Sequence, residues 1–116
     1  MVLELRDYQT ADGRRPFLEW LEALKDKQAR RRIESRLAVV AAGSLGDTEP
    51  VGGGVLELRI SWGPGYRVYF ARTGEVVVLL LCGGDKRSQD EDIKDAKRYF
   101  EDFKRRTKPA GERGRT

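Results

Sequence analysis

The chain has 116 residues, of which 39% are hydrophobic and 36% are charged, and these values are typical of one globular domain with a single core. Its longest apolar run, residues 76–82, is far shorter than the roughly 20 residues of a membrane-spanning helix, and the N-terminus shows no leader pattern. We therefore expect a cytoplasmic protein that makes no membrane contact. Histidine is absent and cysteine occurs once, so no set of metal ligands is visible, and we expect neither a metal nor a cofactor.

The positive charge is concentrated at the C-terminal end. The formal net charge is +4, but residues 104–116 contain six basic residues and one acidic residue, and the other 103 residues sum to −1. We expect one domain at residues 1–107 and a flexible basic tail at residues 108–116. Such a tail is either a solvated terminus or an arm that is attracted to a polyanion.

The first half of the chain predicts one strand and two helices. Residues 2–8 alternate apolar and polar side chains, as a strand does. Pro16 suits the first turn of a helix, and the apolar residues after it recur at helical spacing. Asp26 suits the N-cap of a second helix, which Gly43 would end. The short connection between the two helices favours an antiparallel hairpin.

The second half changes to a period of two. Residues 56–60, 66–72 and 76–82 predict three antiparallel strands joined by glycine-containing turns. The third strand is apolar on both faces, which indicates cover on each side, and we expect its Cys82 to be buried and unreactive. A final amphipathic helix over residues 88–106 would supply part of that cover. We therefore predict an α+β fold with a small antiparallel sheet, an N-terminal helical hairpin and a C-terminal helix.

Polar side chains interrupt two of these strands. With a period of two, Glu57 and Arg59 share one face of their strand, and Arg67 and Tyr69 share one face of the next. A solvated sheet face with cross-strand ion pairs would explain this pattern, but Lys86 follows at the end of the third strand. Adjacent cations repel one another unless an anion binds between them. The pattern therefore indicates an anion-binding site on the sheet.

The series "ELRI…GPGYRVYF…LLLCGGDKRSQ.EDI..AKRYF" resembles a known family. It is similar to the RelE/ParE superfamily of toxins from bacterial toxin–antitoxin modules, in particular to the branch of addiction module killer proteins, which are similar to HigB-type toxins. The resemblance extends over residues 3–103. It implies a small antiparallel sheet with two N-terminal helices and a C-terminal helix, in agreement with the elements predicted above.

The resemblance also implies a function. Toxins of this kind inhibit translation by cleaving messenger RNA on the ribosome, and a cognate antitoxin holds them inactive; we expect that partner to carry a helix-turn-helix domain. In RelE-like nucleases the reaction is metal-free. The 2′-hydroxyl attacks the adjacent phosphate and leaves a cyclic phosphate and a 5′-hydroxyl.

This chemistry needs a proton acceptor and cations that stabilise the charged phosphate. Arg67 is our first candidate for a phosphate clamp, because its planar guanidinium can donate two hydrogen bonds, and on a polar face its replacement should change stability little. Arg59 is the second cation, and Lys86 matches the basic residue that family members carry after the last strand. For the proton acceptor, Glu57, a lysine of lowered pKa or a tyrosine stay open, since the lysine-rich strand of some RelE members is not matched.

Further RNA contacts are expected from two tyrosines and three basic residues. Tyr69 and Tyr99 could stack on bases, although core packing would explain either of them equally well. The basic residues are Arg87, Lys104 and Arg105.

Two other functions stay open. ParE-type relatives share the fold, lack the nuclease residues and act by binding DNA gyrase; the grouping of Arg59, Arg67 and Lys86 favours the nuclease over this alternative. A non-toxic regulatory or DNA-associated domain is supported by the basic tail alone.

Overall fold

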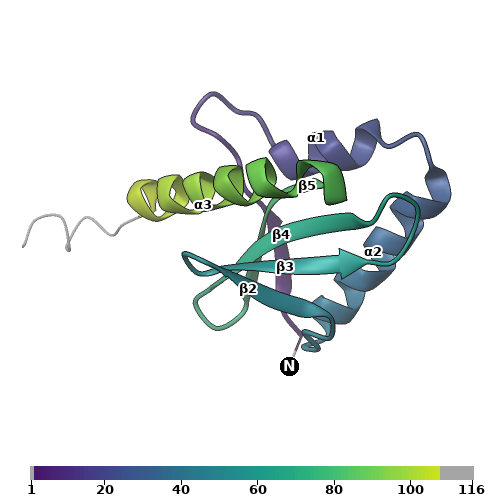
Figure 1. Cartoon of the computed structure of the whole chain (residues 1–116). Coiled ribbons are helices and arrows are strands. Elements are labelled where there is room, and N and C mark those ends of the chain that lie inside the picture. Colours follow the sequence, from purple (N-terminus) through teal and green to yellow (C-terminus); the bar gives the residue numbers. More distant parts are fainter. Residues whose placement is uncertain (1, 108–116) are drawn as a thin grey trace, which may run out of the picture.

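The computed structural model describes residues 2–107 (Figure 1); the tail expected at residues 108–116 lies outside them. Within these residues the chain forms five strands, three α-helices and a short 3₁₀ turn, in the order β1 (Glu4–Asp7), α1 (Pro16–Ala23), α2 (Lys27–Ala41), β2 (Thr48–Gly52), β3 (Val55–Ile60), β4 (Tyr66–Thr73), β5 (Val77–Gly84), the 3₁₀ turn (Lys86–Ser88) and α3 (Gln89–Arg106). None of these helices is both long and apolar enough to cross a membrane.

The strands form one sheet with the order β1-β5-β4-β3-β2. Strands β2 to β5 are an antiparallel meander, as expected, whereas β1 pairs with β5 in parallel. The α+β class is confirmed. The sheet is mixed instead of purely antiparallel, because β1 is parallel to β5. This pairing was not predicted, because it joins distant parts of the chain that no local pattern links. The edge strand β2 was not predicted. Its sequence, TEPVG, contains a proline, which an edge strand tolerates.

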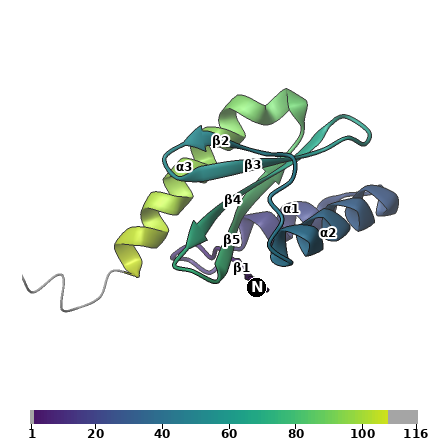
Figure 2. The ribbon, with the colours of Figure 1, turned by 90° about the horizontal axis from the view of Figure 1, so that it is seen from below.

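Helices cover both faces of the sheet (Figure 2). On one face, α1 packs against β5 and α2 against β3; on the other, α3 crosses β4 and β5. Pro16 begins α1 and Asp26 caps α2, as predicted, and the Asp26 carboxylate accepts hydrogen bonds from two backbone N–H groups at 2.9 and 3.1 Å. The two helices are joined by residues 24–26 and contact different strands of this face.

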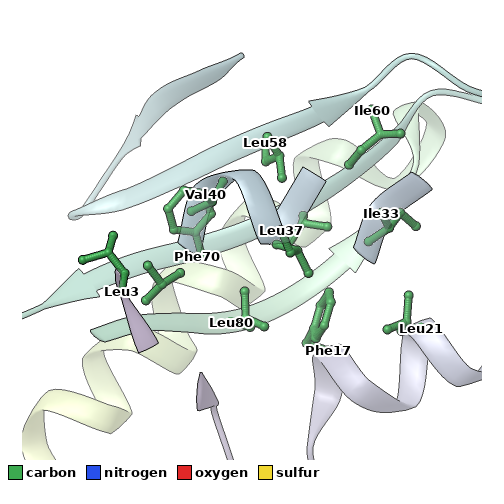
Figure 3. Close-up of a cluster of buried hydrophobic side chains, with 12 residues drawn as sticks. Leu3, Phe17, Leu21, Ile33, Leu37, Val40, Leu58, Ile60, Phe70 and Leu80 are labelled. Carbon is green, nitrogen blue, oxygen red and sulfur yellow. The ribbon is translucent and has the colours of Figure 1, made fainter. Parts of the chain in front are cut away.

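The two faces bury separate cores. Figure 3 shows the first core, which lies between the sheet and the α1–α2 layer and includes Phe17, Ile33, Leu37, Leu58 and Phe70. The second core lies under α3 and includes Tyr8, Val55, Tyr69, Leu79, Leu81, Cys82, Ala96 and Phe100. Strand β5 supplies side chains to both cores, which explains why it is apolar on both faces. Cys82 is buried as expected, and burial, followed by the nearby acidic side chains of α3, raises its thiol pKa.

Two glycines at the end of β5 let a helix approach each face closely. A Cβ atom at Gly83 would overlap the ring of Trp20 in α1. A Cβ atom at Gly84 would overlap the Asp92 carboxylate and lie 2.7 Å from Ser88 Oγ. The first turn of α3 can therefore lie directly on the end of β5.

Candidate functional site

The predicted convergence of the polar residues is confirmed at the β3–β4 hairpin. Arg59 lies directly opposite Arg67, and Glu57 lies directly opposite Tyr69. Their side chains belong to the face that α3 covers, and Gln89 at the start of α3 contacts one of them. Two arginines opposite each other repel, so the arrangement needs a nearby counter-charge.

Glu57 supplies that counter-charge. Its side chain is 1% exposed. One carboxylate oxygen accepts a hydrogen bond from Arg59 Nε at 3.0 Å, and the other accepts from Tyr69 OH at 2.9 Å and from Gln89 Nε2 at 2.8 Å. Arg67 Nε lies 3.7 Å from the second oxygen. A buried carboxylate with so many donors fixes the positions of the side chains around it.

These contacts also decide what Glu57 can do chemically. Burial by itself would raise its pKa, but the hydrogen bonds from Gln89, Arg59 and Tyr69 outweigh burial, and the pKa of Glu57 lies below its ordinary value. A carboxylate of lowered pKa is a weak base, and here both oxygens are already engaged. These contacts argue against Glu57 among the three candidates for the proton acceptor, and its geometry suits a group that positions the two arginines.

Arg67 lies in a largely closed position. Only 12% of its side chain is exposed, its Nη1 group donates to the carbonyl oxygen of Gly65 at 3.1 Å, and its buried Nε has no hydrogen-bond partner within residues 2–107. Its Nη2 group makes no hydrogen bond within these residues and is the donor that remains for an anion. The expectation that replacing Arg67 would leave stability unchanged is revised, because the side chain is mostly buried beside Glu57.

Arg59 and Lys86 are the more exposed cations of the site; Arg59 lies on β3 and Lys86 follows β5, on either side of Arg67 in β4. Arg59 is 48% exposed, and its Nη2 group lies 3.4 Å from the carboxylate of Glu49. Lys86 begins the turn that follows β5 and is exposed. Gly65 lies between Lys86 and Arg67, since a Cβ atom at Gly65 would be 3.7 Å from Lys86 Cβ and 3.6 Å from Arg67 Nη1. The structure thus brings together the three cations chosen from the sequence.

Tyr69 does not offer a surface to RNA. Its side chain is fully buried, and burial together with the hydrogen bond to Glu57 raises its pKa. No face of the ring is open to a base, which corrects the expectation that Tyr69 stacks on RNA. Its observed contact is the hydrogen bond that helps to fix Glu57.

The other expected RNA contacts do not join the cluster. Figure 1 shows α3 running away from the β3–β4 turn. Tyr99 follows Gln89 by ten residues, about 15 Å along the helix axis, and its ring stacks on Tyr8 with centroids 5.0 Å apart. Lys104 and Arg105 belong to the last turn of α3, more than about 20 Å from its start.

Arg87 is near the site in sequence but is directed elsewhere. Its side chain is 85% exposed and pairs with the carboxylate of Asp85 at 3.1 Å. Asp85 also accepts a hydrogen bond from the backbone N–H of Arg87, which fixes the 3₁₀ turn. This contact shows how Arg87 stabilises the turn that carries Lys86.

Sequence reasoning missed Gln89. The sequence did contain a signal for it, because a strand that is apolar on both faces requires a helix over each face. The polar side chains of β3 and β4 point to one of those faces, so a polar residue of the covering helix had to meet Glu57.

Comparisons with known proteins show what this chain is similar to. No protein-family model matches it. An uncharacterised protein of Haemophilus influenzae is 48% identical to it over 81 residues, which are 70% of this chain and 82% of that protein. Among solved structures, a mutant of the E. coli toxin RelE in the free state is similar, with a TM-score of 0.61 and 16% identity over 84% of this chain and 98% of that chain. The likeness to RelE shows that the fold is RelE-like, as the sequence predicted.

Proposed function

The chain belongs to the same family as the Haemophilus influenzae protein, and from this premise and its RelE-like fold we propose that it is the toxin of a type II toxin–antitoxin module. More specifically, we propose that it is a member of the RelE/ParE superfamily, close to the HigB-type addiction module killer proteins, and that it is a metal-free endoribonuclease that cleaves messenger RNA on the ribosome.

The opposed pair Arg59–Arg67 is the observation that carries this proposal. Two guanidinium groups lie side by side over one buried carboxylate, with Lys86 at the adjoining strand end. Glu57 offsets the charge of one of the three cations, and the exposed carboxylate of Glu49 lies 3.4 Å from Arg59 and offsets part of another. The remaining positive charge and the free Nη2 group of Arg67 suit a phosphate.

In the proposed reaction the 2′-hydroxyl of one nucleotide loses its proton and attacks the adjacent phosphorus, the bond from phosphorus to the 5′-oxygen breaks, and a cyclic phosphate and a 5′-hydroxyl result. The phosphate carries most charge in the transition state, so cations that are fixed beforehand lower the barrier. Arg67 donates to a phosphate oxygen, Arg59 stabilises the second, and Lys86 donates to the leaving 5′-oxygen. With Glu57 engaged, the 2′ proton passes to solvent in this scheme.

A nuclease of this kind requires a partner that holds it inactive. We expect a cognate antitoxin with a helix-turn-helix domain that covers the Arg67–Lys86 end of the sheet. Co-expression with the protein encoded next to this gene should yield a stable complex in which message cleavage is suppressed.

The test is cleavage of messages in a translating extract. Purified protein is added, the cut sites are mapped by primer extension, and the new 3′ ends are analysed for cyclic phosphate. We expect cuts in translated message and none in the same message without ribosomes. A parallel arm measures supercoiling by DNA gyrase. Intact messages together with inhibited gyrase would overturn the proposal in favour of a ParE-like toxin.

A further inference from the structure

A basic groove lies outside the candidate site, between α2 and the end of β3. Its volume is about 570 Å³, and it is lined chiefly by Gln28, Arg31, Arg32, Ser35, Arg36 and Ser61. The five α2 residues recur at intervals of three and four, so they form one stripe along the helix. No carboxylate lines the groove.

Two of the groove arginines are held in place by neighbouring groups. The guanidinium carbon of Arg32 lies 3.9 Å from the ring centroid of Trp62, and Trp62 Nε1 donates to Asp26 Oδ2 at 3.0 Å. Arg36 lies 3.4 Å from the carboxylate of Asp47. Stacking on an indole fixes the plane of a guanidinium and leaves its N–H donors free. Within residues 2–107, neither Arg31 nor Arg32 makes a hydrogen bond or an ion pair.

The charge of this groove is not a general property of the domain. The first 103 residues sum to −1, yet three arginines without an acidic residue line this one groove. The neighbouring Arg30 is paired with Glu34 at 3.9 Å. Arg36 is paired with Asp47, but Arg31 and Arg32 are not paired within residues 2–107, and two such cations in one concave region are the electrostatic footprint of a polyanion site.

We infer that this groove binds the phosphodiester backbone of RNA at a place separate from the candidate cleavage site. The inference rests on the proposed function for RNA as the anion, and it deepens that function by adding a second contact. Ser61 lines both this groove and the hollow beside Arg59, and two residues of strand span about 7 Å. The carboxylates of Asp47 and Glu49 also line that hollow, so the groove adjoins the candidate site and is a separate contact for RNA.

The shape of the groove favours RNA over an acidic peptide. Its lining residues are six polar ones and a single large aliphatic residue, Ile60, which offers few anchors for the apolar side chains of a peptide. Flat guanidinium groups with free paired donors match the geometry of phosphate oxygens.

The test compares two double variants of equal charge. Arg31→Gln with Arg32→Gln alters the groove. Arg6→Gln with Arg30→Gln removes the same charge from arginines that do not line the groove and are paired with Glu4 and Glu34. Binding is measured over a salt series with two probes, an uncleavable 2′-O-methyl oligonucleotide and purified small ribosomal subunits. The single variant Arg31→Gln is included because Arg32 also packs on Trp62.

Each lost phosphate contact should reduce the salt slope of log K by about 0.7, so the groove variant should lose about 1.4 and bind roughly tenfold more weakly near 0.15 M salt. The affinity of the control should stay within about threefold of that of the parent. The single variant Arg31→Gln should show about half of the change in log K that the double groove variant shows. A loss with the oligonucleotide identifies the message strand as the source of the phosphates, whereas a loss with subunits alone identifies ribosomal RNA.

Equal behaviour of groove variant and control with both probes would overturn the inference. So would a groove variant that keeps its RNA affinity and loses the antitoxin, because the groove would then be a protein interface. Binding is read without cleavage, so a protein that binds RNA through the groove but cuts no message would overturn the proposed function alone.

Discussion

Replacing Glu57 with glutamine should destabilise the fold far more than the same change at a surface carboxylate. Glutamine keeps the shape of the side chain but removes the charge that offsets Arg59 and Arg67. Its amide nitrogen would also face groups that are themselves donors. Arg67, whose side chain is 12% exposed, would then lack a counter-charge on its buried side.

The expected magnitude follows from the exposure of the two arginines. Breaking a buried ion pair costs about 3–5 kcal/mol, whereas an exposed pair contributes about 0–1 kcal/mol. Glu57 contacts one largely buried arginine and one that is 48% exposed, so we expect a loss of about 3 kcal/mol. At about 5 °C per kcal/mol for a domain of this size, Tm should fall by about 15 °C.

Thermal melting followed by circular dichroism measures this loss, with Glu49→Gln as the matched control. Glu49 lies 3.4 Å from the same Arg59, but its side chain is 62% exposed, so its variant should melt within about 5 °C of the parent. A Glu57→Gln protein that melts like the control would refute the positioning role. If that folded variant also lost cleavage by about 100-fold or more, Glu57 would return as the proton acceptor.

Other predictions concern the contact of α3 with β5, the response to acid and the single thiol. Gly84→Ala places a methyl group against Asp92 and Ser88 and should cost about 1–3 kcal/mol in urea unfolding. Folding lowers the pKa of Glu57. The stability that this carboxylate contributes is therefore complete above its unfolded pKa of about 4.3 and is lost as the pH falls through the lower folded value. Melts at decreasing pH should show a smaller fall in Tm for Glu57→Gln than for the parent. Cys82, whose thiol pKa burial raises, should react with a thiol reagent only when the protein unfolds.

The fold class and the shared face of the polar residues could be predicted because both depend on local patterns. A period of two and a short turn suffice to place Arg59 opposite Arg67. The parallel pairing of β1 with β5 joins segments more than 70 residues apart, and β2 has too few apolar residues to show alternation. Neither could be derived from neighbouring residues.

The chemical roles of the site residues were harder to predict than which residues form the site. Alternation places Glu57 on the polar face, where a side chain is normally solvated, but α3 closes over that face and Gln89 completes the cage around the carboxylate. The groove beside α2 also could not be predicted from the amino-acid composition. Helical spacing aligns Arg31 with Ser35 and Arg32 with Arg36, but the stack of Arg32 on Trp62 depends on how α2 meets the β3–β4 turn.

The most direct test of the central claim is single-turnover cleavage by Arg67→Ala on programmed ribosomes, with RNA affinity and thermal melting measured on the same protein. Loss of a transition-state donor should lower the rate roughly 100- to 1000-fold, or by about 2.7–4 kcal/mol, while affinity changes much less. Arg67→Lys should restore only part of the rate, because an ammonium lacks the two-pronged geometry of a guanidinium. A folded Arg67→Ala protein that cleaves at the parental rate would contradict the claim that Arg67 binds the scissile phosphate.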